Sequence, residues 1–241
     1  MNKSKIVLIT GANKGIGLET ARQLGKKGYL VLLGARDEEK GREAVSVLIN
    51  EGIDTRFLLL DVTRHGTINH ATELIEKEYG YLDVLINNAG IYLDNESTPS
   101  QLELSVLKET FETNFFGVFA MIKAMLPLLI KSDEGGRIVN VSSGQGSLTR
   151  NSSPNSTSRL QLAYNSSKSA LNALTIQFAR EFKNTPFKIN SAAPGFTATD
   201  MNKGMGTRTV QQASVVIVRL ATLDENGPTG GFFEDTGEVP W

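Results

Sequence analysis

The sequence predicts an α/β protein in which a doubly wound parallel sheet of about seven strands carries helices on both faces. Short β-branched and leucine-rich runs alternate with longer amphipathic stretches along the whole chain, which is the pattern of repeated strand-helix-strand units. The strand candidates are continuously apolar, and strands buried on both faces are typical of parallel sheets. No linker, charge block or repeat divides the 241 residues, so we expect one domain over residues 1–241.

The first two strand-helix pairs are the clearest. An apolar strand is expected over residues 5–10, and a glycine-rich turn leads from it into a helix over 15–27. A second strand over 30–33 precedes a helix over 38–51, for which Asp37 is the expected N-cap.

The middle of the chain continues the alternation. A strand over 56–60 precedes a helix over 66–79, and a strand over 84–87 precedes a long helix over 104–131. The most apolar part of that helix, residues 115–130, contains a lysine and a proline and is shorter than the roughly 20 residues of a membrane span. We therefore expect a buried core helix there and no membrane partner.

The last third completes the sheet. Strands are expected over residues 137–141 and 188–192, and helices over 163–183 and 210–223. A short terminal strand is expected around 231–233.

Composition excludes several chemistries. The chain has no cysteine, which removes disulfide scaffolds, zinc-thiolate sites and cysteine nucleophiles. Its two histidines, His65 and His70, are expected at solvated helix positions, so no metal site is predicted. A net charge of -1 lacks the basic surface that nucleic-acid binding requires.

The beginning of the chain carries no recognisable export signal. Only about five apolar residues follow the polar residues 1–5, which is shorter than the apolar stretch of a secretory signal. We expect a cytoplasmic protein.

A glycine-rich turn joins the first strand to the first helix. Gly11, Gly15 and Gly17 would let the backbone turn tightly and approach a pyrophosphate, while the helix N-terminus favours the anion. No Gly-Lys-Ser/Thr follows, so a nucleotide triphosphatase is not indicated.

Further motifs follow this turn in a defined order. They are Asn87-Asn88-Ala89-Gly90 after the fourth strand, Asn114 in the next helix, Ser143 after the fifth strand, Tyr164 and Lys168 on the following helix, and Pro194-Gly195 with Thr199 after the sixth strand. With these motifs the chain resembles the short-chain dehydrogenase/reductase family over nearly its whole length, and in particular its NADPH-dependent carbonyl reductases. The resemblance implies a Rossmann-like fold and an NADP-dependent oxidoreductase acting on CH–OH groups.

Tyr164 and Lys168 suggest how a proton could be supplied. They lie four residues apart and share a helix face with apolar residues, so we expect both to point inward. A nearby ammonium favours phenolate, which would lower the pKa of Tyr164 from about 10 toward the working range and suit it to protonate a carbonyl oxygen.

The resemblance assigns roles to the remaining catalytic candidates. It implies that Ser143 hydrogen-bonds the substrate oxygen, that Lys168 also holds the nicotinamide ribose, and that Asn114 anchors a water that relays protons. The expected catalytic set is thus Asn114, Ser143, Tyr164 and Lys168. A serine hydrolase is not indicated, because Ser143 is not in a Gly-x-Ser-x-Gly turn and no histidine base is placed near it.

The end of the second strand bears on cofactor choice. Ala35 stands where an NAD-selective member would carry an acid, while Arg36 and Lys14 offer positive charge for a phosphate, so we expect NADP(H). The expected cofactor-binding residues are Gly11, Asn13, Lys14, Gly15, Ile16, Gly17, Arg36, Asp61, Val62, Asn88, Ala89, Gly90, Tyr164, Lys168, Pro194, Gly195, Thr197 and Thr199.

Three loops at strand ends should form the substrate pocket, over about residues 91–100, 144–160 and 200–210. Their mixed composition favours an uncharged, moderately apolar carbonyl compound. The expected reaction is reversible reduction of a ketone or aldehyde, and the alternative is a catalytically silent regulatory protein that senses NADP(H). A monomer and a homo-oligomer both stay open, because the segment between Ser143 and Tyr164 is longer than the family's usual dozen residues but shorter than the insertion of monomeric carbonyl reductases.

Overall fold

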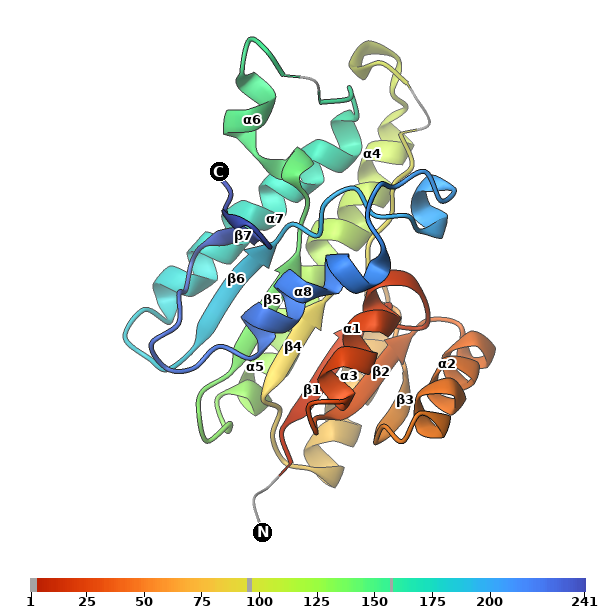
Figure 1. Ribbon diagram of the computed structural model, residues 1–241, viewed down its shortest axis with the longest axis vertical. Coiled ribbons are helices and arrows are strands. Elements are labelled where there is room, and N and C mark those ends of the chain that lie inside the picture. Colours follow the sequence, from red (N-terminus) through yellow and green to blue (C-terminus); the bar gives the residue numbers. More distant parts are fainter. Residues whose placement is uncertain (1–3, 95–96, 157) are drawn as a thin grey trace.

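Eight strands form one sheet in the computed structural model, which describes residues 4–94, 97–156 and 158–241 (Figure 1). Their order is β3-β2-β1-β4-β5-β6-β7-β8, and neighbouring strands are parallel except for the antiparallel pair of β7 and β8. The strands are β1 (Ile6–Thr10), β2 (Leu30–Ala35), β3 (Thr55–Leu59), β4 (Val84–Asn87), β5 (Arg137–Val141), β6 (Lys188–Ala192), β7 (Phe232–Glu234) and β8 (Gly237–Glu238).

Helices cover both faces of the sheet, as predicted (Figure 1). One face packs against α1 (Gly15–Gly25), α2 (Glu38–Asn50) and α8 (Val210–Ala221), and the other against α3 (His65–Glu78), α5 (Gly117–Leu129) and α7 (Leu162–Glu181). The shorter helical elements are α4 (Leu104–Phe111), α6 (Leu148–Ser152) and the 3₁₀ turns Pro99–Gln101, Gly144–Gly146 and Asp200–Asn202.

Burial explains why the strand sequences are continuously apolar. All five residues of β1 are buried, with Ile6 and Leu8 in the core under α3, α5 and α7, and Val7 and Ile9 in the core under α1, α2 and α8. A strand covered on both faces gains from apolar side chains at every position, so the sheet is doubly wound, as expected.

The strand order reverses direction between β1 and β4. The chain runs outward from β1 to β3, then returns and continues from β4 to β8. The switch point therefore lies at the carboxyl ends of β1 and β4, where folds of this kind form the crevice that binds ligands.

The helix predicted over residues 104–131 has an interruption. A π-helical segment, Glu112–Phe116, separates α4 from α5 within one continuous helix. Composition and length alone would let Leu104–Leu129 cross a membrane, and half of its most apolar window is buried inside the protein. The burial matches the predicted core helix.

Smaller details also differ from the prediction. The short strand β8 follows β7 and caps the sheet edge, and the loop after β5 contains the one-turn helix α6. Asp37 caps α2 as expected, since its carboxylate accepts a hydrogen bond from the Lys40 N–H at 3.1 Å.

Candidate active site

The glycine-rich turn lies at the carboxyl end of β1 and leads into α1. Gly11 and Gly15 have φ of +62° and +59°, a conformation that side-chain-bearing residues rarely adopt. Lys14, at the N-cap of α1, makes no side-chain capping bond, so the first N–H groups of this helix face the crevice without a side-chain acceptor from the cap residue. Such a helix end suits an anionic group.

Two of these glycines pack against the segment after β4. A methyl group at Gly11 would lie 2.9 Å from Cα of Ala89, and one at Gly17 would lie 2.5 Å from Nδ2 of Asn88. That Nδ2 donates to the carbonyl oxygens of Thr10 and Gly11 at 2.9 and 3.0 Å. The turn and the Asn88-Ala89 segment therefore form one unit.

Thr10 is a residue of this unit that the sequence analysis did not select. Its hydroxyl oxygen accepts hydrogen bonds from the N–H groups of Asn88 and Ala89, both at 3.0 Å. Its position directly before the first glycine of the turn was the feature of the sequence that could have indicated this role. Asn87, by contrast, braces the sheet, with Nδ2 donating to Oδ1 of Asn140 at 2.8 Å.

The residues expected to read the cofactor's adenosine end lie at neighbouring strand ends. Ala35 is buried, and Arg36 beside it is exposed and forms no ion pair with any residue that the structure describes. Lys14 forms an exposed ion pair of 2.7 Å with Asp200. A phosphate at this position would compete with the Asp200 carboxylate for Lys14.

Asp61 and Val62 follow β3. Oδ1 of Asp61 accepts from the N–H and hydroxyl of Thr63 at 3.0 and 2.8 Å, which fixes the carboxylate, and Val62 is buried against Gly117. Asn13 and Ile16 lie within the glycine-rich turn and the first turn of α1.

Asn114 lies inside the π-helical segment and is fully buried. Its Oδ1 accepts from the Ile91 N–H at 2.9 Å, and its Nδ2 donates to the Ile91 carbonyl at 2.9 Å and to the Ser167 hydroxyl at 3.1 Å. The amide thus joins the segment after β4 to α7, which carries Tyr164 and Lys168.

The predicted catalytic residues converge near Gly90. A methyl group at Gly90 would lie 3.3 Å from Oδ1 of Asn114 and 3.5 Å from Nζ of Lys168. Nζ of Lys168 lies 5.7 Å from the ring centroid of Tyr164, and the Ser143 hydroxyl is near enough to the Tyr164 phenol to lower its pKa. Asn114, Lys168, Tyr164 and Ser143 therefore surround one small region at the carboxyl ends of β4 and β5.

Burial governs the charge of Lys168. The side chain is 4% exposed, and Nζ donates to the Val141 carbonyl at 2.8 Å. Removal from water is what lowers the pKa of Lys168, to about 8.

The expectation that Lys168 lowers the pKa of Tyr164 is wrong for this structure. Burial of the phenol raises the pKa of Tyr164, and the nearby Ser143 hydroxyl acts in the opposite direction. The Lys168 ammonium lies 5.7 Å from the ring centroid, donates to the Val141 carbonyl and is itself disfavoured by burial. Tyr164 is therefore a protonated phenol near neutral pH.

The segment after β6 forms the other wall of the crevice. Gly195 has φ of +79°, Thr197 is buried with its hydroxyl donating to the Gly195 carbonyl at 3.1 Å, and Thr199 begins a 3₁₀ turn closed by Asn202. The Thr199 methyl carbon would lie 3.7 Å from a methyl group at Gly15. Pro194, Gly195, Thr197 and Thr199 thus lie opposite the glycine-rich turn.

The three predicted substrate loops lie at the same end of the sheet (Figure 1). Tyr92, from the first loop, packs its ring edge-on against the ring of Tyr164 at 5.7 Å. Leu148 and Leu160 from the second loop and Met205 from the third are more than half exposed. Residues 95, 96 and 157 of these loops lie outside the described residues.

Residues 240 and 241 also reach the second loop, which sequence reasoning did not anticipate. The Ser147 hydroxyl donates to the Pro240 carbonyl at 2.6 Å, and the Thr149 N–H donates to the Trp241 carbonyl at 2.8 Å. The Trp241 ring stacks on Phe232 of β7 at 5.6 Å.

We also looked for side chains that could bind a metal ion. Among the residues that the structure describes, no group of three or more His, Asp or Glu side chains could hold a metal ion. His65 and His70 are exposed on α3, as predicted.

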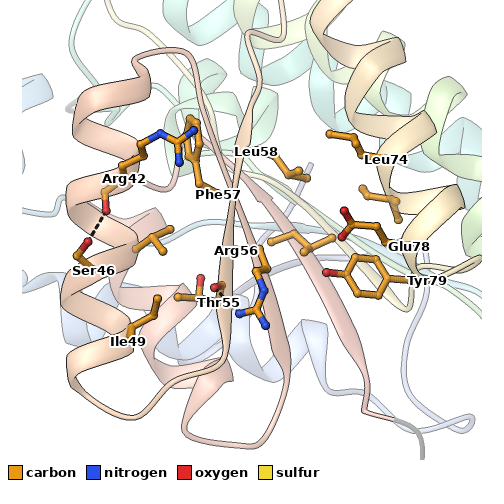
Figure 2. Close-up of a pocket in the computed structure, with 13 residues that line it drawn as sticks. Arg42, Ser46, Ile49, Thr55, Arg56, Phe57, Leu58, Leu74, Glu78 and Tyr79 are labelled. Carbon is orange, nitrogen blue, oxygen red and sulfur yellow. Dashed lines mark hydrogen bonds between the residues drawn. The ribbon is translucent and has the colours of Figure 1, made fainter.

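A groove of about 660 Å³ lies elsewhere, at the β3 edge of the sheet between α2 and α3 (Figure 2). Figure 2 shows Arg42 of α2 beside Phe57 of β3, with the guanidinium 5.4 Å from the ring centroid, and Glu78 and Tyr79 on the opposite side. None of the predicted site residues lines this groove.

The chain is similar to known proteins over most of its length. A family model described as short chain dehydrogenase matches residues 5–209. A short-chain dehydrogenase of Penicillium roqueforti is 38% identical, covering 90% of this chain and 88% of its own length. NADPH carbonyl reductase 1 of Mus musculus is 33% identical over 98% of each chain.

Solved structures agree as well. The NADPH-bound carbonyl reductase from chicken fatty liver superposes with a TM-score of 0.86 at 27% identity, covering 100% of both chains. The chain belongs to the short-chain dehydrogenase family of oxidoreductases.

Proposed function

We propose that this protein catalyses the reversible reduction of a ketone or aldehyde to an alcohol with NADPH, and that Tyr164 supplies the proton. The observation that carries the proposal is the convergence of Asn114, Ser143, Tyr164 and Lys168 beside Gly90. NADPH, when bound, supplies the hydride. The named relatives in mouse and chicken are NADPH carbonyl reductases, which supports the same cofactor here.

The glycine-rich turn and the opposite segment after β6 would hold the dinucleotide. Two features of the turn suit a dinucleotide. The positive φ values of Gly11 and Gly15 belong to a tight turn, and the N-cap side chain of α1 makes no capping bond, so the N–H groups of its first turn can bind a phosphate. Exposed Arg36 and Lys14 would bind the phosphate that distinguishes NADPH from NADH. The proposed cofactor contacts are the cofactor-binding residues named in the sequence analysis.

The acid step follows from the electrostatics of Tyr164. Its pKa is raised by its surroundings, so the phenol is protonated at neutral pH and able to donate to a carbonyl oxygen as negative charge develops there. Ser143 would hydrogen-bond the same oxygen. Lys168 would hold the nicotinamide ribose, and buried Asn114 would anchor a water that relays protons to Lys168.

We place the carbonyl substrate among the three loops. Tyr92, Leu148, Leu160 and Met205 give these loops apolar surface, which favours an uncharged, moderately apolar carbonyl compound. Three further points stay predictions from the sequence. They are a cytoplasmic location, the lack of nucleic-acid and membrane partners, and an oligomeric state that is either monomer or homo-oligomer.

The test is NADPH oxidation by the purified protein against a panel of ketones and aldehydes, with NADH as the second cofactor. Tyr164→Phe should bind NADPH with unchanged affinity and lose about 100- to 10,000-fold in turnover, the range of general acid catalysis. Tight NADPH binding without reduction of any panel compound would instead support a sensing protein. Full activity of Tyr164→Phe would remove Tyr164 from the mechanism.

A further inference from the structure

Asp94 is a buried carboxylate that no role described above uses. Its side chain is 0% exposed, and it lies in the loop after β4, seven residues beyond the end of that strand. No ion pair joins it to a cationic side chain among the residues that the structure describes. A buried charge needs strong hydrogen bonds to offset its lost hydration.

Those hydrogen bonds come from the first turn of α7. Oδ2 accepts from the Ala163 N–H at 2.8 Å, and Oδ1 accepts from the N–H of Tyr164 at 3.0 Å. The local N-cap residue, Gln161, makes no side-chain capping bond. Asp94 therefore does for α7 what an N-cap aspartate usually does, from about 70 positions earlier in the chain.

The same loop also contacts the Tyr164 ring. Tyr92 packs edge-on against that ring at 5.7 Å, and the Tyr92 hydroxyl accepts from Nε2 of Gln161 at 3.1 Å. Asn114 holds Ile91 of this loop through both its N–H and its carbonyl. The loop is thus anchored at Ile91 and fixes both the backbone and the ring of Tyr164.

We propose that Asp94 is a positioning residue, which sets the orientation of Tyr164 by holding the first turn of α7 against the loop after β4. This inference rests on the proposed role of Tyr164 as the acid. Its physical basis is that the second hydrogen bond of Asp94 goes to the N–H of Tyr164 itself, so a change at Asp94 moves the residue that carries the phenol. Displacements of about 1 Å in such a group cost up to about 100-fold in rate.

The experiment compares Asp94→Ala and Asp94→Asn with a matched control, Asp83→Asn. Asp83 is also a carboxylate that accepts from a backbone N–H, that of Ile6 at 2.8 Å, but it precedes β4 at the opposite end of the sheet. We expect Asp94→Ala to lose about 10- to 100-fold in kcat while the Kd for NADPH changes less than twofold. Asp94→Asn, which keeps one acceptor oxygen, should lose less, and Asp83→Asn should keep kcat within twofold.

Two further readouts separate positioning from general destabilisation. The solvent deuterium isotope effect on kcat should increase in Asp94→Ala, because the proton transfer becomes slower than other steps, and should not change in Asp83→Asn. Amide hydrogen exchange in residues 162–168 should accelerate in Asp94→Ala alone. An unchanged kcat, or a loss of kcat matched by an equal loss of folded protein in both positions, would overturn the proposal.

The exchange measurement also keeps the two proposals apart. If none of the carbonyl compounds in the panel makes the unmodified protein oxidise NADPH, the proposed function fails. Faster exchange over 162–168 would still establish Asp94 as the cap of α7, and unchanged exchange would overturn that as well.

Discussion

The two walls of the crevice are built from different kinds of contact. On the cofactor side, the glycine-rich turn and the Asn88-Ala89 segment touch through backbone atoms, with room for no extra carbon at Gly11 or Gly17. On the substrate side, the loop after β5 is held by side chains and by residues 240 and 241. A single substitution in the backbone-packed cofactor wall should therefore have a large effect on ligand binding. A single substitution in the substrate wall, which several side-chain contacts hold, should have a small one.

The largest effect is expected on the cofactor side, from Gly17→Ala. The added methyl group would meet Nδ2 of Asn88 at 2.5 Å and the Gly11 carbonyl at 2.8 Å, so the turn must widen. Overpacking of this kind costs about 1–3 kcal/mol, which is about 5- to 150-fold if it appears in the Kd for NADPH. Binding titrations measure it directly.

The matched control is Gly66→Ala on α3, where a methyl group meets no atom within 4 Å. It should leave the Kd for NADPH within twofold. Equal affinities in the two variants would show that the cofactor wall is as tolerant as the substrate wall.

A graded effect is expected between the walls, at Lys168. Because the pKa of Lys168 is lowered to about 8 and that of Tyr164 is raised, kcat/KM for reduction should fall above pH 8 by about tenfold per pH unit as Lys168 loses its proton. Lys168→Arg should move this decline to higher pH, because arginine keeps its charge. A decline that stays near pH 8 in Lys168→Arg would assign it to another group.

The same lowered pKa predicts how stability depends on pH. The folded state binds the Lys168 proton more weakly than the unfolded state, so stability rises as pH increases from about 8 toward 10.5. Lys168→Met should therefore be more stable than the unmodified protein below pH 8, by up to about 3 kcal/mol, and lose this advantage at higher pH. Thermal unfolding from pH 7 to 10 measures the difference, with exposed Lys123→Met as the control.

The smallest effect is expected on the substrate side, from Trp241→Ala. The ring contact with Phe232 is lost, while the Trp241 carbonyl still accepts from Thr149 and Arg150 keeps its 3.1 Å ion pair with Glu234. We expect a two- to fivefold rise in KM for the carbonyl substrate, about the value of one aromatic pair. Phe182→Ala, which breaks a ring contact with Phe187, should leave that KM unchanged. A loss as large as that of Gly17→Ala would erase the contrast between the walls.

The cofactor wall was also the part that sequence could predict. Glycines at fixed positions specify a backbone path, and apolar runs specify buried strands, so the turn and the first six strands lie where the sequence places them to within about two residues. The charge state of Tyr164 could not be predicted in this way, because it depends on how closely unrelated segments surround the phenol.

Non-local contacts account for the remaining differences. Asp94 gives no local signal of its role, since its partners lie on α7; the available hint was a helix that begins at Leu162 without Ser, Thr, Asp or Asn as its N-cap. No local pattern marks the π-helical segment either, and Asn114 within it contacts Ile91 and Ser167, which are distant in the sequence. The loop after β5 has too few apolar residues for its path to be deduced.

The π-helical segment has a mechanical consequence for the long helix. A π turn takes up one more residue than an α turn, so the side-chain phase of α4 is shifted by about 100° relative to α5. The two parts need not share one apolar stripe: α4 is fitted to α7, and α5 to α3 and β4. The π-helical segment thus separates the packing of α4 from that of α5. The sequence of α4, near the mouth of the crevice, can therefore change while α5 keeps its contacts with the sheet.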